Sequence, residues 1–353
     1  MERYDVVISG GGPCGSFLGY NLASLGFKVC ILEKSNFPRY KVCAGGLPKK
    51  ILKLIDFDIS QVIEDYIKEI EFSYNFCNKK KILAKDFLAF TVKRENFDYF
   101  LLKKAEEKGA KVFLKEGVLN FKIEDEGVVI ESVNKRVFRC KVLVGCDGVF
   151  STIRRLADIK TKSFILTLEK EIEVQRLDNF KQKILINFDN RVRGYFWIFP
   201  KKDILSCGVG GAGLDAQKAE SFLKEWLSKN LLTDFKVRFS YFWPIYINVF
   251  NPPLILNKRV ILAGEAAGLV NPLSGEGIYW ALKSSKLASI CISEFLNRKK
   301  DLKNYSKIIK KYILSKFKKH AFLSFLLYNT SKFGYNLFIK YNKKIKKWFT
   351  EDE

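Results

Sequence analysis

The sequence predicts an α/β protein: a Rossmann-type dinucleotide-binding domain built on a parallel sheet, interrupted by an inserted antiparallel-sheet domain and followed by a helical tail. Three observations lead to this prediction. The chain opens with a strand, a glycine-rich turn and a helix; short strands separated by turns replace that pattern near the middle; and a parallel-strand pattern returns just before residue 264. The length of 353 residues and the 48% content of hydrophobic residues suffice for a sizeable core.

The amino-acid composition limits the kinds of catalytic site that the chain can form. His320 is the only histidine and the eight cysteines include no CxxC pair, so there is little material for a metal centre or a Ser-His or Cys-His catalytic pair. We therefore expect no metal ion, and redox chemistry that depends on a bound cofactor. The chain has no signal peptide and no apolar run of about 20 residues, which indicates a cytoplasmic protein with reduced thiols.

The N-terminal segment has the order of a nucleotide-binding βαβ unit. A β-branched strand is predicted over residues 4–9, a helix over 16–24 and a second strand over 28–33. The turn between the first two elements contains Gly10-x-Gly12-x-x-Gly15. In this context Gly10 forms the tight turn, Gly12 admits a pyrophosphate and Gly15 lets the helix approach the strand.

The second strand ends in Glu33, which is followed by Lys34. Glu33 lies 18 positions beyond Gly15, where its carboxylate can accept hydrogen bonds from a ribose diol. An acid at this point repels a 2′-phosphate, so the site disfavours NADP. A second match, Gly208-x-Gly210-x-x-Gly213, follows a strand of an antiparallel meander, and we interpret it as a glycine-rich turn and not as a nicotinamide site.

The rest of the sequence predicts further helices and strands, and their arrangement divides the chain into domains. A helix is predicted over 96–108, parallel strands over 110–114, 139–144 and 260–264, a helix over 277–295, and meander strands over 184–188, 194–199 and 204–209. The expected domains are a discontinuous cofactor-binding domain over 1–50, 90–160 and 258–300, a substrate domain over 51–89 and 161–257, and a basic helical tail over 301–353.

Three further blocks follow the first glycine motif along the chain. They are Arg94-Glu95-Asn96-Phe97-Asp98-x-x-Leu101, Gly145-x-Asp147-Gly148-x-x-Ser151-x-x-Arg154-Arg155, and Gly264-Glu265-Ala266-Ala267-Gly268 continuing to Pro272-x-x-Gly275-Glu276-Gly277-Ile278. Together with residues 10–15 they resemble the FAD-binding set of the flavoprotein superfamily that includes aromatic hydroxylases, halogenases and geranylgeranyl reductases. Residues 37–47, FPRYKVCAGGL, and 195–201, YFWIFPK, resemble the geranylgeranyl reductase pattern in particular.

The resemblance implies FAD as cofactor and assigns roles to these blocks. The expected FAD-binding residues are Gly10, Gly12, Gly15, Glu33, Lys34, Arg94, Asp147, Gly148, Glu265, Gly275, Gly277 and Ile278. Asp147 and Gly148 would bind flavin-linked hydroxyls, and the helix that starts at Ile278 would place N–H groups near the flavin pyrimidine. Arg94 would neutralise negative charge of the cofactor. The alternative is a solvated arginine at the protein surface. Glu265 stands where the family has Asp, with a side chain one methylene group longer, and Ala44 stands where the family has a glycine.

The candidate catalytic and substrate-binding residues come from the two blocks that resemble the geranylgeranyl reductase pattern. Cys43 lies in a glycine-containing loop next to Arg39 and Lys41, a setting that favours a reactive thiol, and it is the candidate catalytic residue; the alternative is a buried structural thiol. Tyr195, Trp197 and Phe199 occupy every second position, so their side chains lie on one face of the strand. They form either an apolar wall over the flavin or an ordinary part of the sheet core. The expected substrate-binding residues are Gly45, Gly46, Tyr195, Trp197, Phe199 and Pro200.

The resemblance implies a reductase that saturates C=C bonds of a geranylgeranyl or other isoprenoid chain, on a prenyl diphosphate or a prenyl lipid. Reduction of the flavin requires a transient electron donor, either NAD(P)H or a ferredoxin-type protein. A flavin-dependent monooxygenase or halogenase is the alternative enzyme, since Tyr195-x-Trp197-x-x-Pro200 also resembles a halogenase element. The alternative outside enzymes is a basic membrane- or nucleic-acid-binding protein with a vestigial flavin fold.

The strong positive charge is concentrated at the C-terminal end. The formal net charge is +24, residues 304–350 contain no acid, and 13 lysines lie between Lys303 and Lys347. The lysines are interleaved with aromatic residues, namely Phe317, Phe322, Phe325, Tyr328, Phe333, Phe338 and Trp348. We expect this tail to dock on an anionic membrane surface, or else to form a helical cap whose aromatic residues pack on the core. Nucleic acid is a less favoured partner, because the tail contains no arginine.

Overall fold

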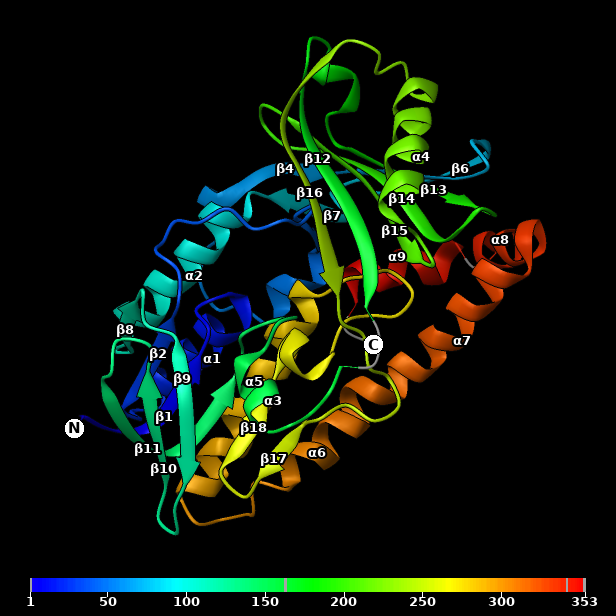
Figure 1. The fold of residues 1–353 in the computed structure, drawn as a ribbon. Helices are drawn as coiled ribbons and strands as arrows, with labels where there is room; N and C mark the ends of the chain where they lie inside the picture. Colours follow the sequence, from blue (N-terminus) through cyan, green and yellow to red (C-terminus); the bar gives the residue numbers. More distant parts are fainter. Residues whose placement is uncertain (1, 162–163, 341, 352–353) are drawn as a thin grey trace. The chain divides into compact units, whose positions relative to one another are not determined.

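The computed structural model describes residues 2–161, 164–340 and 342–351, and its elements follow the α/β order expected from the sequence (Figure 1). The chain forms two compact units. Unit 1 contains residues 1–39, 95–163 and 246–321, and unit 2 contains residues 40–94, 164–245 and 322–353. Each unit is therefore assembled from three separate segments.

Unit 1 is centred on a sheet whose inner strands are parallel. In the order β17-β18-β11-β1-β2-β8, the pairs from β18 to β8 are parallel, β17 is antiparallel, and β9 and β10 extend from β11. Val6, Val7 and Ile8 in β1 are fully buried, as a parallel strand covered on both faces requires. The elements are β1 (Glu2–Ser9), α1 (Pro13–Ser24), β2 (Val29–Glu33), α2 (Arg94–Glu107), β8 (Lys111–Leu114), β9 (Val118–Ile123), β10 (Val128–Ser132), β11 (Val137–Gly145), α3 (Thr152–Leu156), β17 (Ile255–Asn257), β18 (Val260–Leu262), η4 (Gly264–Ala267), α5 (Ile278–Leu296), α6 (Asn304–Ile309), η5 (Lys310–Leu314) and the first half of α7 (Ser315–Asn329), whose residues from 322 on belong to unit 2.

Unit 2 contains a larger and a smaller antiparallel sheet. The larger has the order β16-β12-β15-β14-β13-β5-β6, in which only the described pair of β13 with β5 is parallel, and the smaller has the order β3-β7-β4. The elements are β3 (Gly46–Pro48), η1 (Lys49–Lys53), η2 (Ser60–Val62), β4 (Ile63–Ile67), β5 (Glu69–Tyr74), β6 (Cys77–Leu83), β7 (Ala89–Val92), β12 (Ile165–Val174), η3 (Leu177–Phe180), β13 (Lys183–Asp189), β14 (Val192–Pro200), β15 (Leu205–Ala212), α4 (Ala216–Lys229), β16 (Phe235–Ile245), α8 (Ser331–Lys340) and α9 (Asn342–Thr350).

Alternation along the larger sheet decides which side chains face α4. Phe196 and Ile198 of β14 are buried together with Leu223 and Trp226 of α4, so one face of the sheet carries the hydrophobic core of this unit. Successive side chains of a strand point to opposite faces. Tyr195, Trp197 and Phe199 therefore point to the face opposite to α4, as the alternation in the sequence predicts.

The helices of the basic tail are divided between the two units. In unit 1, the Phe317 ring packs on the Trp280 ring with 4.8 Å between centroids. In unit 2, the Tyr335 hydroxyl donates to the carbonyl oxygen atoms of Phe72 and Asn78, at 3.1 and 2.7 Å. Some tail aromatics thus belong to the cores, whereas Phe322, Phe325 and Phe333 are 62 to 69% exposed. Within the described residues, every helix is too short or too polar to cross a lipid bilayer.

Candidate functional site

The turn after β1 forms a cradle that only glycines can build. Gly10 has a φ of +103°, and a Cβ atom on it would lie 2.6 Å from the carbonyl oxygen of Cys146. A Cβ atom on Gly15 would lie 1.9 Å from the carbonyl oxygen of Gly10, whereas the first atom that a Cβ on Gly12 would meet is Nη2 of Arg39, at 3.5 Å. The open side of Gly12 at the N-terminus of α1 is therefore suited to a phosphate, which the helix dipole and free N–H groups stabilise.

Glu33 connects the end of β2 to this turn. Its Oε2 atom accepts a hydrogen bond from the Gly11 N–H at 2.7 Å, and its Oε1 atom accepts one from the Ser35 N–H at 2.8 Å. Each carboxylate oxygen has a second lone pair, so a ribose hydroxyl can still bind. Glu33 is buried, and its neighbour Lys34 is exposed beside the same strand end.

Asp147 presents an acceptor that the described residues leave unsatisfied. Its Oδ2 atom accepts hydrogen bonds from the N–H groups of Thr152 and Ile153, at 2.8 and 3.2 Å. Its Oδ1 atom is shielded from solvent and has no hydrogen-bond partner among the described residues. Burial also raises the pKa of Asp147. A buried acceptor without a partner is a position for a ligand hydroxyl.

Glu265 lies next to Gly148, the residue that follows Asp147. Its Oε2 atom would be 4.0 Å from a Cβ on Gly148, and its Oε1 atom accepts a hydrogen bond from the Tyr246 N–H at 3.3 Å. Gly148 has a φ of +72°, in the left-handed region that favours glycine. The two carboxylates therefore border one backbone turn in unit 1.

Asn271 forms hydrogen bonds within the loop before α5. The Asn271 Oδ1 atom accepts a hydrogen bond from the Leu273 N–H at 2.9 Å, and its Nδ2 atom lies 3.0 Å from Nδ1 of His320. Gly275 adopts a φ of +66°, and Gly277 caps the helix that begins at Ile278. The first N–H groups of a helix have no partner within it, so this end of α5 can stabilise negative charge. Sequence analysis did not anticipate the role of His320.

Arg39 is a second residue whose position the sequence analysis missed. Its Nη1 atom lies 3.2 Å from Oδ2 of the fully buried Asp98, which directs the guanidinium toward Gly12. In the sequence, Arg39 is notable only as a basic neighbour of Cys43. Arg94, the predicted charge neutraliser, begins α2 and is 8% exposed, so the alternative of a solvated surface arginine is wrong.

In unit 2, the Cys43 loop is fixed against the end of β14. Gly45 has a φ of +74° and its N–H lies 3.4 Å from Sγ of the half-buried Cys43. A Cβ atom on Gly46 would lie 2.3 Å from the Phe199 ring, so the ring rests on this glycine. The nearby Thr91 hydroxyl donates to the Pro200 carbonyl oxygen at 2.6 Å. Gly46 and Phe199 are thus in contact next to Cys43, Gly45 and Pro200, and their role in substrate binding stays a prediction.

The second glycine motif is not a turn, contrary to our interpretation of the sequence. Gly208 and Gly210 lie inside strand β15, and the Trp197 ring covers them, since Cβ atoms there would be 2.1 and 3.6 Å from it. Gly208 pairs with Trp197 on one side and with Glu169 on the other. The glycines therefore provide room for a large indole ring.

Aromatic residues of β16 extend this face of the sheet. Phe239, Tyr241 and Trp243 alternate along β16 and pair with Glu171, Glu169 and Thr167 of β12. The Tyr40 ring stacks on Phe239, with 4.5 Å between centroids. The sequence analysis predicted neither this strand nor its aromatic residues.

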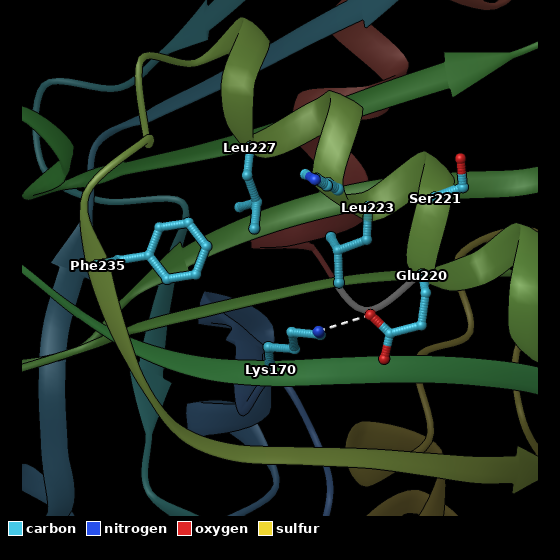
Figure 2. A pocket seen from close by; sticks show the side chains of 7 residues that line it. Lys170, Glu220, Ser221, Leu223, Leu227 and Phe235 are labelled. Atoms are coloured by element: carbon cyan, nitrogen blue, oxygen red, sulfur yellow. Dashed lines mark ion pairs between the residues drawn. The ribbon is translucent and has the colours of Figure 1, made fainter.

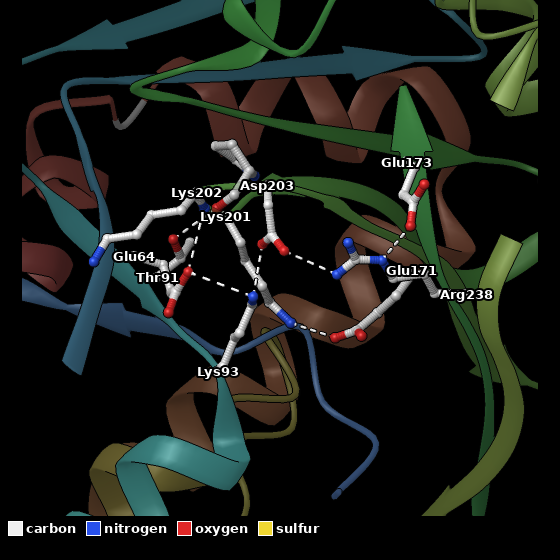
Figure 3. A network of polar contacts seen from close by, with 10 residues as sticks. Glu64, Thr91, Lys93, Glu171, Glu173, Lys201, Lys202, Asp203 and Arg238 are labelled. Atoms are coloured by element: carbon white, nitrogen blue, oxygen red, sulfur yellow. Dashed lines mark hydrogen bonds and ion pairs between the residues drawn. The ribbon is translucent and has the colours of Figure 1, made fainter. Parts of the chain in front are cut away.

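Buried charges occupy the middle of the same face. Lys201 Nζ lies 2.6 Å from Oε1 of Glu171, and both side chains are at most 7% exposed (Figure 3). Glu169 is 3% exposed and accepts a hydrogen bond from the Ser206 hydroxyl at 2.8 Å. Burial raises the pKa of Glu169 to about 7. No described group of His, Cys, Asp and Glu side chains is arranged to hold a metal ion.

A cleft of about 320 Å³ lies on the opposite, α4-covered side of the sheet (Figure 2). Leu223, Leu227 and Phe235 give it an apolar lining, and an ion pair of 2.6 Å joins Lys170 to Glu220 at its edge. Lys170 adjoins Glu169 in β12 and so points away from the face that carries the acids. This cleft is therefore separate from the candidate substrate face.

The residues of unit 1 fit FAD, because they combine an open glycine turn that can admit a pyrophosphate, a buried acid at the end of β2 that can accept from a ribose, an unsatisfied buried acceptor and a helix N-terminus. The FAD binding domain family matches residues 3–184. The digeranylgeranylglycerophospholipid reductase of Methanococcus vannielii is 31% identical over 326 residues, which cover 86% of this chain and 80% of that protein. The reductase of the same name from Methanocaldococcus jannaschii is 31% identical over 309 residues, which cover 81% and 76%.

Solved structures agree with these relatives. A geranylgeranyl bacteriochlorophyll reductase-like protein from Thermoplasma acidophilum has a TM-score of 0.85 and 21% identity, covering 100% of this chain and 94% of that one. A flavin-dependent brominase has a TM-score of 0.80 and 19% identity, covering 98% and 94%. At these identities the structures share the fold alone. The domain match and the relatives together show that the chain is an FAD-dependent oxidoreductase of the geranylgeranyl reductase family.

Proposed function

We propose that the enzyme saturates C=C bonds of a geranylgeranyl chain, carried by a phospholipid or a diphosphate. Two relatives at 31% identity are named for a digeranylgeranyl phospholipid substrate. The observation that carries the proposal is the aromatic face of unit 2, where Trp197 covers Gly208 and Gly210 next to the Cys43 loop. Such a face can bind an apolar chain and exclude water.

The chemistry explains why these residues suit an alkene. Bound FAD, once reduced, supplies a hydride, but an isolated alkene is a poor hydride acceptor unless a proton is added to the other carbon. Tyr195, Trp197 and Phe199 would hold the chain, and Cys43 would influence the proton step. The electron donor would be NAD(P)H or a ferredoxin-type protein that visits transiently.

The test is an anaerobic turnover assay. Dithionite-reduced enzyme is mixed with geranylgeranyl phospholipid or geranylgeranyl diphosphate, and the products are analysed by mass spectrometry. We expect addition of hydrogen pairs without oxygen. Products that contain added oxygen or halogen, formed only in air, would move the assignment to a monooxygenase or halogenase. Replacing dithionite by NADH, NADPH or reduced ferredoxin then identifies the donor.

We propose in addition that the basic tail docks on an anionic membrane. Phe322, Phe325 and Phe333 are exposed in a segment that has many lysines and no acid between residues 304 and 350. Aromatic side chains insert at a lipid interface, and each lysine near anionic headgroups contributes about 1 kcal/mol. A prenyl lipid resides in such a membrane, so docking would bring the enzyme to its substrate.

A further inference from the structure

Two carboxyl groups and an ammonium group lie inside the aromatic face of unit 2. Glu169 and Glu171 of β12 point to this face with Ser206 of β15, and Lys201 follows directly after β14. Aromatic residues flank them on both sides, from β14 and from β16. Glu171, Lys201 and Glu169 are nearly or fully buried.

The cluster is unlike the ion pairs that surround it. Figure 3 shows a chain of partly exposed ion pairs from Lys93 through Asp203 and Arg238 to Glu173. These pairs are solvated and need no special explanation. Buried charges are different, because desolvation offsets most of the attraction, and apolar residues of similar size usually stabilise a fold as well. A buried ionisable cluster on a candidate substrate face therefore indicates a functional site.

The two carboxyl groups have different hydrogen-bond partners. The Lys201 ammonium donates a hydrogen bond of 2.6 Å to Oε1 of Glu171. Glu169 has the neutral Ser206 hydroxyl as its hydrogen-bond donor, at 2.8 Å. Lys201 and Lys41 favour the ionised form of Glu169, whereas burial and the charge of Glu171 oppose it, and burial is the largest effect. Near neutral pH a substantial fraction of Glu169 is therefore protonated.

Gly208 lies between Glu169 and Trp197, a residue of the aromatic face. Glu169 and Trp197 are the cross-strand neighbours of Gly208 on its two sides, and Gly208 has no side chain to separate them. Lys201 also interacts electrostatically with Cys43, which connects the cluster to the Cys43 loop. Glu169, Trp197 and the Cys43 loop are therefore parts of one candidate site within unit 2.

We propose that Glu169 is the acid that supplies the proton for C=C saturation, and that Lys201, Glu171 and Ser206 hold it in position. This inference rests on the proposed function. The O–H bond of Glu169 breaks as a C–H bond forms at one alkene carbon, while the hydride for the other carbon, with its two electrons, would be supplied by reduced FAD. The resulting Glu169 carboxylate is then reprotonated from solvent.

The first measurement does not depend on turnover. Infrared spectroscopy of the FAD-bound protein near neutral pH should show a C=O band of a buried protonated carboxyl group, which titrates away as the pH rises. Glu169→Gln should remove this band. The matched control Glu173→Gln changes a carboxylate of the same strand and face that pairs with Arg238, and should retain it.

The second measurement follows single-turnover oxidation of the prereduced flavin by a prenyl lipid without oxygen. We expect Glu169→Gln to slow this step at least a hundredfold while reduction by dithionite is unchanged, and Glu169→Asp to recover part of the rate. The wild-type rate should fall as the pH rises above 7, and the rate of Glu169→Gln should lack this dependence. An unchanged rate in a folded Glu169→Gln, or a band that persists in it, overturns the inference. If the wild type reduces no prenyl lipid, the proposed function fails, and the infrared band still decides whether Glu169 carries the proton.

Discussion

The backbone N–H of Gly11 donates a hydrogen bond of 2.7 Å to Oε2 of Glu33, so a buried acid at the end of β2 fixes the turn that follows β1. Glu33→Gln keeps the volume but removes the charge and one acceptor. We expect the Kd for FAD to rise at least tenfold, which is about 1.4 kcal/mol. Fluorescence titration of the apoprotein with FAD measures this. The exposed Glu131→Gln should bind FAD like the wild type, and equal affinity of both variants would exclude a role for Glu33.

Two glycines of the same turn should respond differently to substitution. Gly12→Val fills open space, so the protein should fold but purify without the yellow colour of FAD, because the side chain blocks the pyrophosphate. Gly15→Ala places a Cβ atom 1.9 Å from the Gly10 carbonyl oxygen and should reduce the stability of the fold itself. Absorbance of the flavin and circular dichroism distinguish these results. A yellow Gly12→Val protein would contradict the assignment of the cradle.

Arg39 should contribute to binding of the cofactor phosphates through its charge. Its guanidinium lies beside Gly12 and is held by Asp98. A charge-assisted hydrogen bond contributes about 1.5–3 kcal/mol, so Arg39→Gln should weaken FAD binding roughly tenfold to a hundredfold. The exposed Arg155→Gln is the matched control. If Arg39→Gln and Arg155→Gln bind FAD with equal affinity, and that affinity does not depend on the salt concentration, the charge of Arg39 does not contribute to FAD binding. Arg39 would then have a structural role only.

The raised pKa of Glu169 predicts a dependence of stability on pH. Because the folded pKa of about 7 lies above the ordinary value of 4.5, the folded state binds more protons between these values. The contribution of Glu169 to stability is therefore fully present below pH 4.5 and is lost as the pH rises to 7, by about 3 kcal/mol. Urea unfolding at several pH values should show this decrease for the wild type relative to Glu169→Gln.

Glu173→Gln provides a control of opposite sign for that experiment. The hydrogen bond from Arg238 lowers the pKa of Glu173, so the stability that Glu173 contributes is lost as the pH falls. The difference between wild type and Glu173→Gln should therefore grow toward higher pH. A pH dependence of the same sign for both variants would contradict the assignment of the protonated carboxyl group.

Membrane docking predicts that three phenylalanines act together. Fully burying one phenylalanine contributes about 1.5–3 kcal/mol, so Phe322→Ser, Phe325→Ser and Phe333→Ser combined should weaken binding to anionic liposomes at least tenfold. High salt should release the wild type. Phe250→Ser, at an exposed position of unit 1, is the control in a sedimentation assay. Deletion of residues 303–353 is a poor test, because it removes the buried Tyr305, Phe317 and Tyr335.

The residues of the dinucleotide turn could be predicted from the sequence because their roles are local. Gly10, Gly12 and Gly15 act through backbone conformation and close approach within a few residues, and these requirements leave a fixed spacing. Asp147, Gly275 and Ile278 likewise follow a strand end or begin a helix. The paired alternation of Tyr195, Trp197 and Phe199 was predicted for the same reason, since a strand places every second residue on one face.

The acids of β12 and the position of Arg39 could not be predicted, because they depend on strand register and on partners far along the chain. Glu169 meets Ser206 across 37 positions, and Arg39 meets Asp98 across 59. Acids alternating in a strand are typical of a solvated face, and nothing local indicates that β16 and Trp197 cover them. Gly208 was misinterpreted in the same way, since the ring that it accommodates belongs to another strand.

The division of each unit into three segments affects how the protein must fold. The chain passes from one unit to the other five times, at residues 39, 94, 163, 245 and 321. β18 can join the parallel sheet of unit 1 only after the whole of β12 to β16 has been synthesised. Such distant contacts make folding slow, and every contiguous fragment that contains all the described strands of unit 1 also contains the segments 40–94 and 164–245 of unit 2. A newly made chain therefore exposes an unpaired edge of β11 until β18 has been synthesised, and such an edge can pair with other chains.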